Sequence, residues 1–202
     1  TLATANTLGN VTDATLNYEY SAAVAVMPAS TALTGNTLRY SGAATTTAIN
    51  ATSSLTLNGL MQAGTAALTI SGGPATGGII IGSTNELVVT ANAQNTTISS
   101  VIKDGGSAGR LVYSGAGSTL TLNGAGIAYS GGTTINAGSV DWQNISSVAS
   151  GTMTINAGGT LTTSLIGVNS NINSFLVLNG GSITSSVAGN GNYGNFTINS
   201  KI

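Results

Sequence analysis

The chain has 202 residues, only 4% of them charged, and its formal net charge is −1. Soluble domains usually contain roughly one quarter charged residues. So little charge excludes an electrostatic nucleic-acid binder and a polybasic membrane-surface protein, because both need a basic patch. No stretch approaches the roughly 18 apolar residues that a membrane-spanning helix requires. We therefore predict no nucleic-acid partner and no transmembrane segment in this chain.

The residue types predict a chain that is almost entirely β. Thr, Val and Ile favour strands, Gly and Asn favour turns, and the helix formers Glu, Lys, Arg and Gln are scarce. Short runs of alternating apolar and polar residues are separated by Gly, Asn and Ser, as expected for strands whose successive side chains point to opposite faces. In chain order, the predicted strands cover residues 37–40, 54–57, 67–70, 79–81, 87–90, 96–99, 110–113, 119–122, 133–135, 152–155, 160–162, 175–178, 182–184 and 196–198.

One short phrase recurs along these elements: an aliphatic residue, then Asn, then Gly, Ala or Ser. It stands at residues 57–59, 122–124, 135–137, 155–157, 178–180 and 198–200. In the last third of the chain its Asn residues fall at positions 136, 156, 179 and 199, in steps of 20, 23 and 20. A repeat of this length predicts a solenoid with one coil per repeat, of roughly 20 residues.

Two all-β layouts could use such short strands: a sandwich or up-and-down barrel built from hairpins, and a parallel β-helix. The near-constant spacing favours the β-helix, because hairpin architectures need no such repetition. Coils stacked about 4.8 Å apart would also align the repeated Asn side chains into a hydrogen-bonded ladder. We predict that this structural ladder consists of Asn58, Asn123, Asn136, Asn156, Asn179 and Asn199.

The first 36 residues fit the repeat poorly. An apolar run, two of the six Tyr residues and one of the two Pro residues lie among them. A solenoid needs its end coil covered. We therefore predict two parts: an N-terminal cap or assembly segment at residues 1–36 and the β-solenoid at residues 37–202.

Residues 115–140, GAGSTLTLNGAGIAYSGGTTINAGSV, extend the phrase into a longer pattern. The residues that carry this pattern are Gly115, Gly117, Leu120, Leu122, Gly124, Tyr129, Ser130, Gly131, Gly132, Thr133, Thr134, Ile135, Asn136 and Gly138. The stretch resembles the autotransporter-associated β-strand repeat, also called the passenger-associated transport repeat, with residues 126–128 replacing the usual Asn before the Tyr. The resemblance implies a right-handed parallel β-helix in a secreted or surface-displayed bacterial protein, where such repeats act as stalks, adhesins or spacers.

The sequence offers little for catalysis or metal binding. It has no Cys and no His, so it can assemble neither a zinc site nor a Ser nucleophile with a His base. The local group of charges formed by Lys103, Asp104 and Arg110, across a Gly-rich loop, is interpreted as a solvated loop rather than as the edge of a site. We predict no enzyme activity, no catalytic or metal-binding residues and no cofactor.

Two further patterns concern the outer surface. Thr-x-Thr at residues 119–121 and 152–154 could order water, as in ice-binding proteins, but residues 175–177 replace both Thr residues with Phe and Val. This interruption favours ordinary outward β propensity. Candidates for outward apolar groups, which would mark contacts with a neighbour or a sugar, are Phe175, Val177, Trp142 and Tyr193. Trp142 could instead cover a coil corner.

Together these inferences predict an extracellular structural or adhesive β-solenoid module of a bacterial surface or secreted protein. An alternative is a subunit of a self-assembling extracellular fibre joined end to end, since uncapped strand edges can pair with another chain. A distant alternative is a polysaccharide-active β-helix enzyme, which would need converging carboxylates. The expected partners are a second copy of the chain, or glycans and proteins of a cell surface. The expected location is extracellular or on the bacterial cell surface.

Overall fold

The computed structural model describes residues 2–4, 8–21, 24–43, 45–72, 77–124, 126–143, 150–163, 170–172, 174–185 and 196–198. Parallel strands stack as a β-solenoid whose turns are about 22 residues apart, slightly more than the roughly 20 predicted. The predicted all-β, parallel solenoid is therefore confirmed, and the sandwich or barrel alternative is wrong. Among the described residues the helical content is one 3-10 turn, η1 (Leu8–Asn10).

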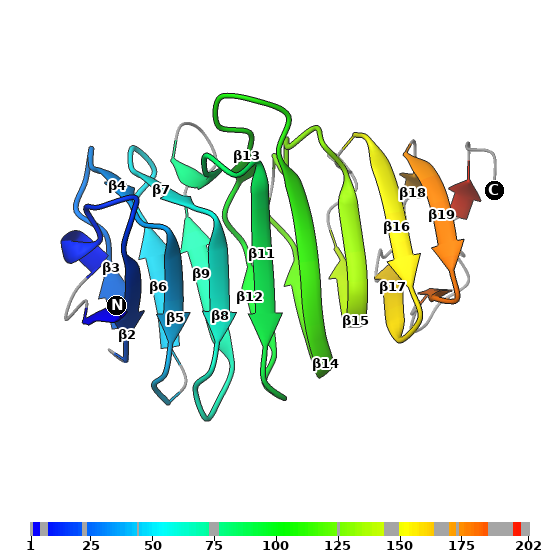
Figure 1. Ribbon diagram of the computed structural model, residues 1–202, viewed down its shortest axis with the longest axis horizontal. Helices are drawn as coiled ribbons and strands as arrows, with labels where there is room; N and C mark the ends of the chain where they lie inside the picture. Colours follow the sequence, from blue (N-terminus) through cyan, green and yellow to red (C-terminus); the bar gives the residue numbers. More distant parts are fainter. Residues whose placement is uncertain are drawn as a thin grey trace, which may run out of the picture.

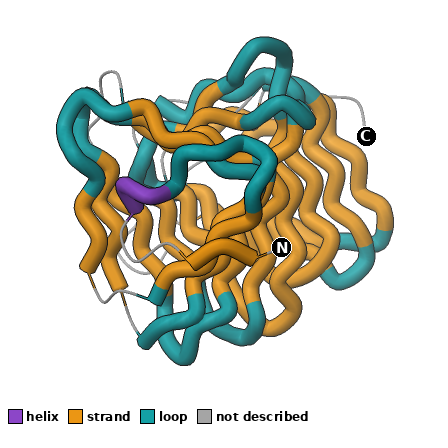
Figure 2. Tube along the Cα trace, turned by 60° about the vertical axis from the view of Figure 1, so that its left-hand side comes forward, coloured by secondary structure: helices purple, strands orange, loops and turns teal. Residues whose placement is uncertain are grey.

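The strands form three ladders, which we call faces 1, 2 and 3 (Figures 1 and 2). Face 1 contains β1 (Leu2–Thr4), β2 (Asn17–Tyr20), β5 (Thr37–Tyr40), β8 (Gly59–Gln62), β11 (Glu86–Ala91), the first part of β14 (Arg110–Leu122), the first part of β15 (Thr133–Trp142), β16 (Thr152–Asn156) and β19 (Phe175–Asn179). In Figure 1 the labelled strands of this face lie side by side along the long axis.

The other two ladders close the coils. Face 2 contains β3 (Val24–Val26), β6 (Thr45–Ile49), β9 (Leu68–Gly72), β12 (Thr96–Ile98), the second parts of β14 and β15, β17 (Gly159–Thr163) and β20 (Ser182–Ser185). Face 3 contains β4 (Ala32–Thr34), β7 (Ser54–Leu57), β10 (Gly78–Ile81) and β13 (Ile102–Lys103). A separate two-stranded sheet pairs β18 (Ser170–Ile172) with β21 (Phe196–Ile198).

The ladders run through the predicted boundary at residue 37. Within the first 36 residues, β2 pairs with β5, β3 with β6, and β4 with β7, all in parallel. These strands continue the solenoid, although their sequences lack the recurring phrase. Whether the segment also acts as a cap or an assembly element stays a prediction.

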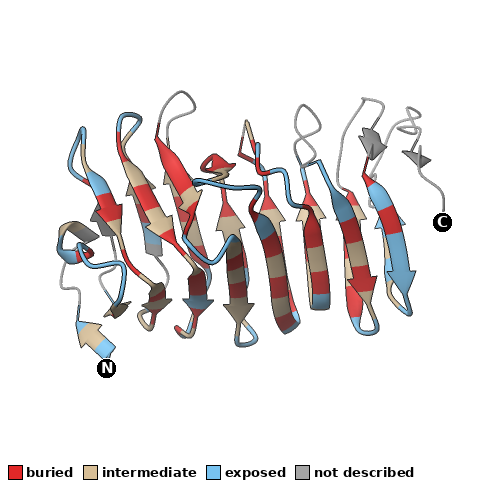
Figure 3. Ribbon diagram, turned by 45° about the horizontal axis from the view of Figure 1, so that its top comes forward, coloured by how far each residue is buried: buried red, intermediate tan, exposed pale blue. Residues whose placement is uncertain are grey.

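The core consists of side chains stacked from coil to coil. Buried and less buried residues alternate along most strands (Figure 3), because successive side chains point to opposite sides of a strand. One buried stack of face 1 comprises Tyr18, Leu38, Leu60, Val89, Tyr113, Ile135 and Ile155. Leu178 is next in register after Ile155, but it is 41% exposed. Fully burying an aliphatic or aromatic side chain of this size stabilises the fold by roughly 1.5–3 kcal/mol. Such stacks therefore supply most of the favourable free energy.

Trp142 belongs to this core. It is 3% exposed and pairs in register with Leu122, whose side chain is also buried. The prediction of Trp142 as an outward group is therefore wrong, because β15 continues past the corner and its alternation turns this residue inward. Phe175 and Val177, by contrast, are 68% and 46% exposed. Tyr193 lies outside the described residues.

Buried tyrosine hydroxyls find partners inside the coils. The pairs are Tyr20–Thr47 at 2.8 Å, Tyr113–Ser118 at 2.8 Å and Tyr129–Thr133 at 2.7 Å. Burial raises the pKa of both Tyr20 and Tyr129 above the ordinary tyrosine range. These phenols are therefore neutral and serve as hydrogen-bonded core residues, not as acids or bases.

Glycines occupy corners where adjacent coils come closest. Gly138 has a φ of +80°, and a Cβ there would collide with the carbonyl oxygen of Gly115 in the preceding coil. Gly117 has a similar φ of +73° but no neighbouring heavy atom within 4 Å of a Cβ. A substitution at Gly117 therefore measures the free-energy cost of the left-handed backbone alone, and one at Gly138 measures that cost together with the clash between coils.

We expect Gly138→Ala to destabilise the protein by about 3 kcal/mol or more, since it adds a backbone clash to an unfavourable left-handed conformation. Gly117→Ala is the matched control and should cost only about 1–2 kcal/mol. Urea unfolding of the two variants measures both free energies. Equal losses would show that the coils do not approach each other at Gly138.

Candidate functional site

Three of the predicted Asn residues form a ladder where face 1 ends. Asn156 Nδ2 donates to Asn136 Oδ1 at 2.8 Å, and Asn179 Nδ2 donates to Asn156 Oδ1 at 3.1 Å. Asn136 Nδ2 in turn donates to Ser114 Oγ at 3.2 Å. The phrase works here because its aliphatic residue is the last side chain pointing inward from the strand, and the following Asn stands at the corner.

Asn58 belongs to a second ladder, at the corner where face 1 begins. Asn58 Nδ2 donates to Asn36 Oδ1 at 2.9 Å, and Asn36 Nδ2 donates to Asn17 Oδ1 at 2.8 Å. Thr84 Oγ1 continues the series by donating to Asn58 Oδ1 at 3.0 Å. Sequence reasoning missed Asn17 and Asn36 because Tyr and Thr, not Gly, Ala or Ser, follow them. Their spacings of 19 and 22 residues were the signal that could have found them.

The six predicted residues therefore do not form one ladder. Asn123 follows the last strand residue of face 2, so it stands at a different corner. Its backbone N–H donates to the Ile98 carbonyl at 3.2 Å, and its side chain is exposed and joins neither ladder. Asn199 lies outside the described residues. One phrase thus marks three different corners, because each corner follows an inward aliphatic residue.

Hydroxyl groups make similar bridges on face 2. Thr160 Oγ1 and Ser182 Oγ are 2.9 Å apart, and Thr162 Oγ1 and Thr184 Oγ1 are 3.0 Å apart. Ser139 Oγ also lies 3.0 Å from Thr162 Oγ1. These hydroxyls bond to one another between coils, so they contribute to cohesion of the stack.

The two predicted Thr-x-Thr motifs lie on different faces. Residues 119–121 are on face 2, where they pair with residues 139–141, whereas residues 152–154 are on face 1. Thr152 and Thr154 pair with Phe175 and Val177, as the repeat in the sequence predicts. The two motifs are therefore not parts of one array. The reason is that β14 passes a corner between residues 114 and 119 and changes face.

Four charged residues form ion pairs between adjacent coils. Glu19 and Arg39 form an ion pair of 3.4 Å between adjacent coils, and Glu86 pairs with Arg110 in the same way. Both pairs are partly exposed, so each contributes at most about 1 kcal/mol. Among the described residues no group of three or more His, Cys, Asp or Glu side chains could hold a metal ion.

Asp104 holds the loop between β13 and β14. Its Oδ1 accepts the Gly109 N–H at 2.7 Å and the Ser130 N–H at 3.0 Å, and its Oδ2 accepts the Ser130 hydroxyl at 2.6 Å. Burial alone would raise the pKa of this carboxyl, but the hydrogen bonds from Ser130 and Gly109 outweigh it and lower the pKa. The carboxylate is therefore ionised at neutral pH and ties two coils together. In the predicted group of Lys103, Asp104 and Arg110, Asp104 is thus bound to Gly109 and Ser130, and Arg110 is paired with Glu86.

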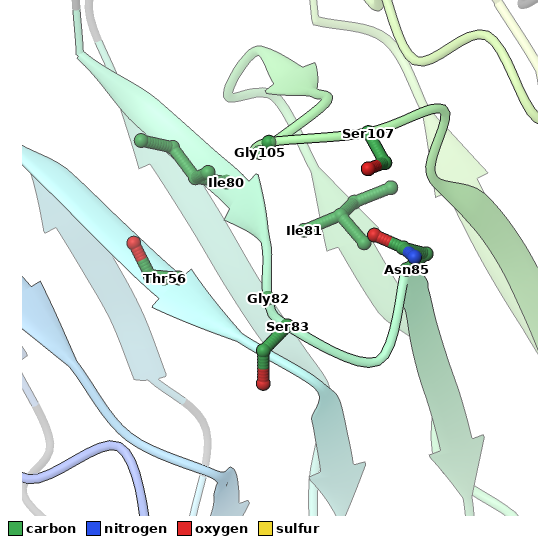
Figure 4. A pocket seen from close by; sticks show the side chains of 9 residues that line it. Thr56, Ile80, Ile81, Gly82, Ser83, Asn85, Gly105 and Ser107 are labelled. Carbon is green, nitrogen blue, oxygen red and sulfur yellow. The ribbon is translucent and has the colours of Figure 1, made fainter.

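A cleft of about 380 Å³ opens beside this loop (Figure 4). Its lining residues are Thr56, Ile80, Ile81, Gly82, Ser83, Asn85, Gly105, Gly106 and Ser107. Thr56 and Ile80 are paired on neighbouring strands of face 3 and form the floor. The turn after β10 and the loop after β13 form the walls. No ionisable side chain lines the cleft.

No protein-family model matches the chain, and neither a curated protein nor a solved structure matches it. Within the part of the chain that the structure describes, no helix has the length and apolar character needed to cross a membrane.

We expect Asn156→Ala to lower the free energy of unfolding by about 1–2 kcal/mol, because it breaks the bonds to both Asn136 and Asn179. Asn123→Ala is the control, since that side chain joins neither ladder, and should change stability by less than about 0.5 kcal/mol. Urea unfolding compares the two. If Asn123→Ala cost as much as Asn156→Ala, the ladder at residues 136, 156 and 179 would not be a stabilising feature.

Proposed function

We propose that the chain is an extracellular structural and adhesive β-solenoid module of a bacterial surface or secreted protein. The observation that carries this proposal is the continuous ladder of face 1 from β1 to β19, in which every coil is joined to its neighbours. An element built in this way is elongated and repetitive, which suits a stalk or spacer. The resemblance of residues 115–140 to a passenger repeat supports the surface location.

The surface chemistry fits this role. Outward positions on face 2 carry Thr and Ser hydroxyls. On face 1, the opposite charges within each ion pair come from adjacent coils and neutralise each other. The stability of such a surface depends little on pH, because few groups on it titrate. It depends little on salt as well, because salt acts mainly by screening exposed charges, and these are few. A module outside the cell meets wider changes of both than a protein in the cytoplasm.

A second candidate is a subunit of a self-assembling extracellular fibre. It is favoured by the exposed apolar side chains of Phe175, Val177 and Leu178 on β19, since exposed apolar groups on a strand mark contacts with other chains. Electron microscopy of the purified chain at increasing concentration tests it. Uniform filaments support the fibre, and dispersed short rods at every concentration contradict it.

The surface location predicts labelling of intact cells. An antibody raised against the purified chain should bind unpermeabilised cells of the bacterium that encodes it as strongly as permeabilised cells. An antibody against a cytoplasmic enzyme is the control and should label permeabilised cells only. If the chain followed the cytoplasmic control, the proposed extracellular function would be wrong.

A further inference from the structure

The cleft beside residues 104–109 combines an apolar floor with unused polar groups. Ile80 and the Thr56 side chain lie next to each other on the floor, and Ser83, Asn85 and Ser107 are exposed on the walls (Figure 4). Within the described chain the side chains of Ser83, Asn85 and Ser107 make no hydrogen bond to another protein group. Two hydroxyls and one amide are therefore free to bind a ligand, with both donors and acceptors.

The walls of the cleft are fixed before any ligand binds. Asp104 holds the loop through three hydrogen bonds, to Gly109 and to Ser130 of the next coil. Cβ atoms at Gly105 and Gly109 would collide with Ile81, so both ends of the loop lie directly against β10. A preformed wall reduces the entropy lost on binding.

The opposite wall is a tight turn. Asn85 has a φ of +58°, and its N–H donates to the Gly82 carbonyl at 3.0 Å. The Asn85 carbonyl accepts a hydrogen bond from the backbone N–H of Arg110, in the following coil, at 3.0 Å. These bonds fix the backbone that carries the Asn85 side chain, so its amide is presented from a rigid position.

The chemistry of the lining selects an uncharged ligand. The nearby Glu86 and Arg110 are paired with each other, and Asp104 is bound to Ser130 and Gly109. Lys103 lies in register beside Ile80 but does not line the cleft. A sugar ring has an apolar C–H face and a rim of hydroxyls, which match the floor and the walls. The volume lies within the roughly 300–1,000 Å³ of small-molecule sites.

We propose that this cleft binds a neutral pyranose sugar, with its C–H face on Ile80 and Thr56 and its hydroxyls on Ser83, Asn85 and Ser107. The biological role of this sugar site rests on the proposed adhesive function. The binding itself is a property of the purified chain and is measured without reference to the cell.

The experiment is saturation-transfer-difference NMR on the full chain with glucose, galactose, mannose and N-acetylglucosamine as separate probes. At least one neutral sugar should receive saturation from the protein, and backbone amide shifts should change at residues 83, 85 and 105–107. Glucuronate is the charged counterpart and should bind more weakly, because no cationic side chain lines the cleft.

The variant Ser83→Ala/Ser107→Ala should weaken sugar binding about tenfold, the change that roughly 1.4 kcal/mol of interaction free energy produces. Both side chains are exposed and make no bond inside the described chain, so the fold should persist in far-UV circular dichroism. Ser150→Ala, an exposed residue outside the cleft, is the matched control and should leave binding unchanged.

A second variant removes the space instead of the hydrogen bonds. Gly106→Leu adds a side chain at the rim, where no heavy atom lies within 4 Å of a Cβ and the backbone is compatible with an L-residue. It should abolish binding while the protein stays folded. No saturation transfer to any neutral sugar, or equal binding by both cleft variants and the control, would overturn the proposal. If either of these results is obtained and the antibody still labels intact cells, the sugar site is rejected and the proposed function stands.

Discussion

The close parallel contact between successive coils is the constraint on which the rest of the structure depends. A single coil has strands of only a few residues and cannot bury its own apolar side chains. Its neighbours, about 4.8 Å away, must do so. Every position is therefore selected by what stands at the equivalent position one coil before and after, as in the buried stack from Tyr18 to Ile155.

The same contact accounts for the polar residues. At a corner the backbone turns away from the ladder, and a side chain that bonds to its own counterpart restores a link between coils. Asn supplies a donor and an acceptor on one side chain, so Asn136, Asn156 and Asn179 form a series without any second residue type. Thr and Ser do this on face 2. Ser83, Asn85 and Ser107, which line the cleft, take no part in these links between coils.

The alternation of apolar and polar residues was sufficient to predict most strands, because burial on one side imposes the same period in any coil. Residues 37–40 and 54–57 form strands with the predicted bounds. The face to which a strand belongs was not predictable from the phrase, because the inward aliphatic residues Leu57, Leu122 and Ile135 precede three different corners. The phrase therefore predicts one ladder for Asn58, Asn123 and Asn136, which stand at three different corners. The cleft was not predictable either, because it arises where a turn and a loop distant in sequence lie over face 3.

The register between coils is the central claim, and a pair of engineered cysteines tests it directly. The chain has no Cys of its own, and Val112 on β14 pairs with Thr134 on β15. The double variant Val112→Cys/Thr134→Cys should form a disulfide under mild oxidation, since adjacent strands lie about 4.8 Å apart, within the range that a disulfide spans. The shifted pair Val112→Cys/Asn136→Cys adds two residues, about 6.6 Å along the strand, and should stay reduced. Efficient cross-linking of the shifted pair, with the first pair reduced, would contradict the register and the stack built on it.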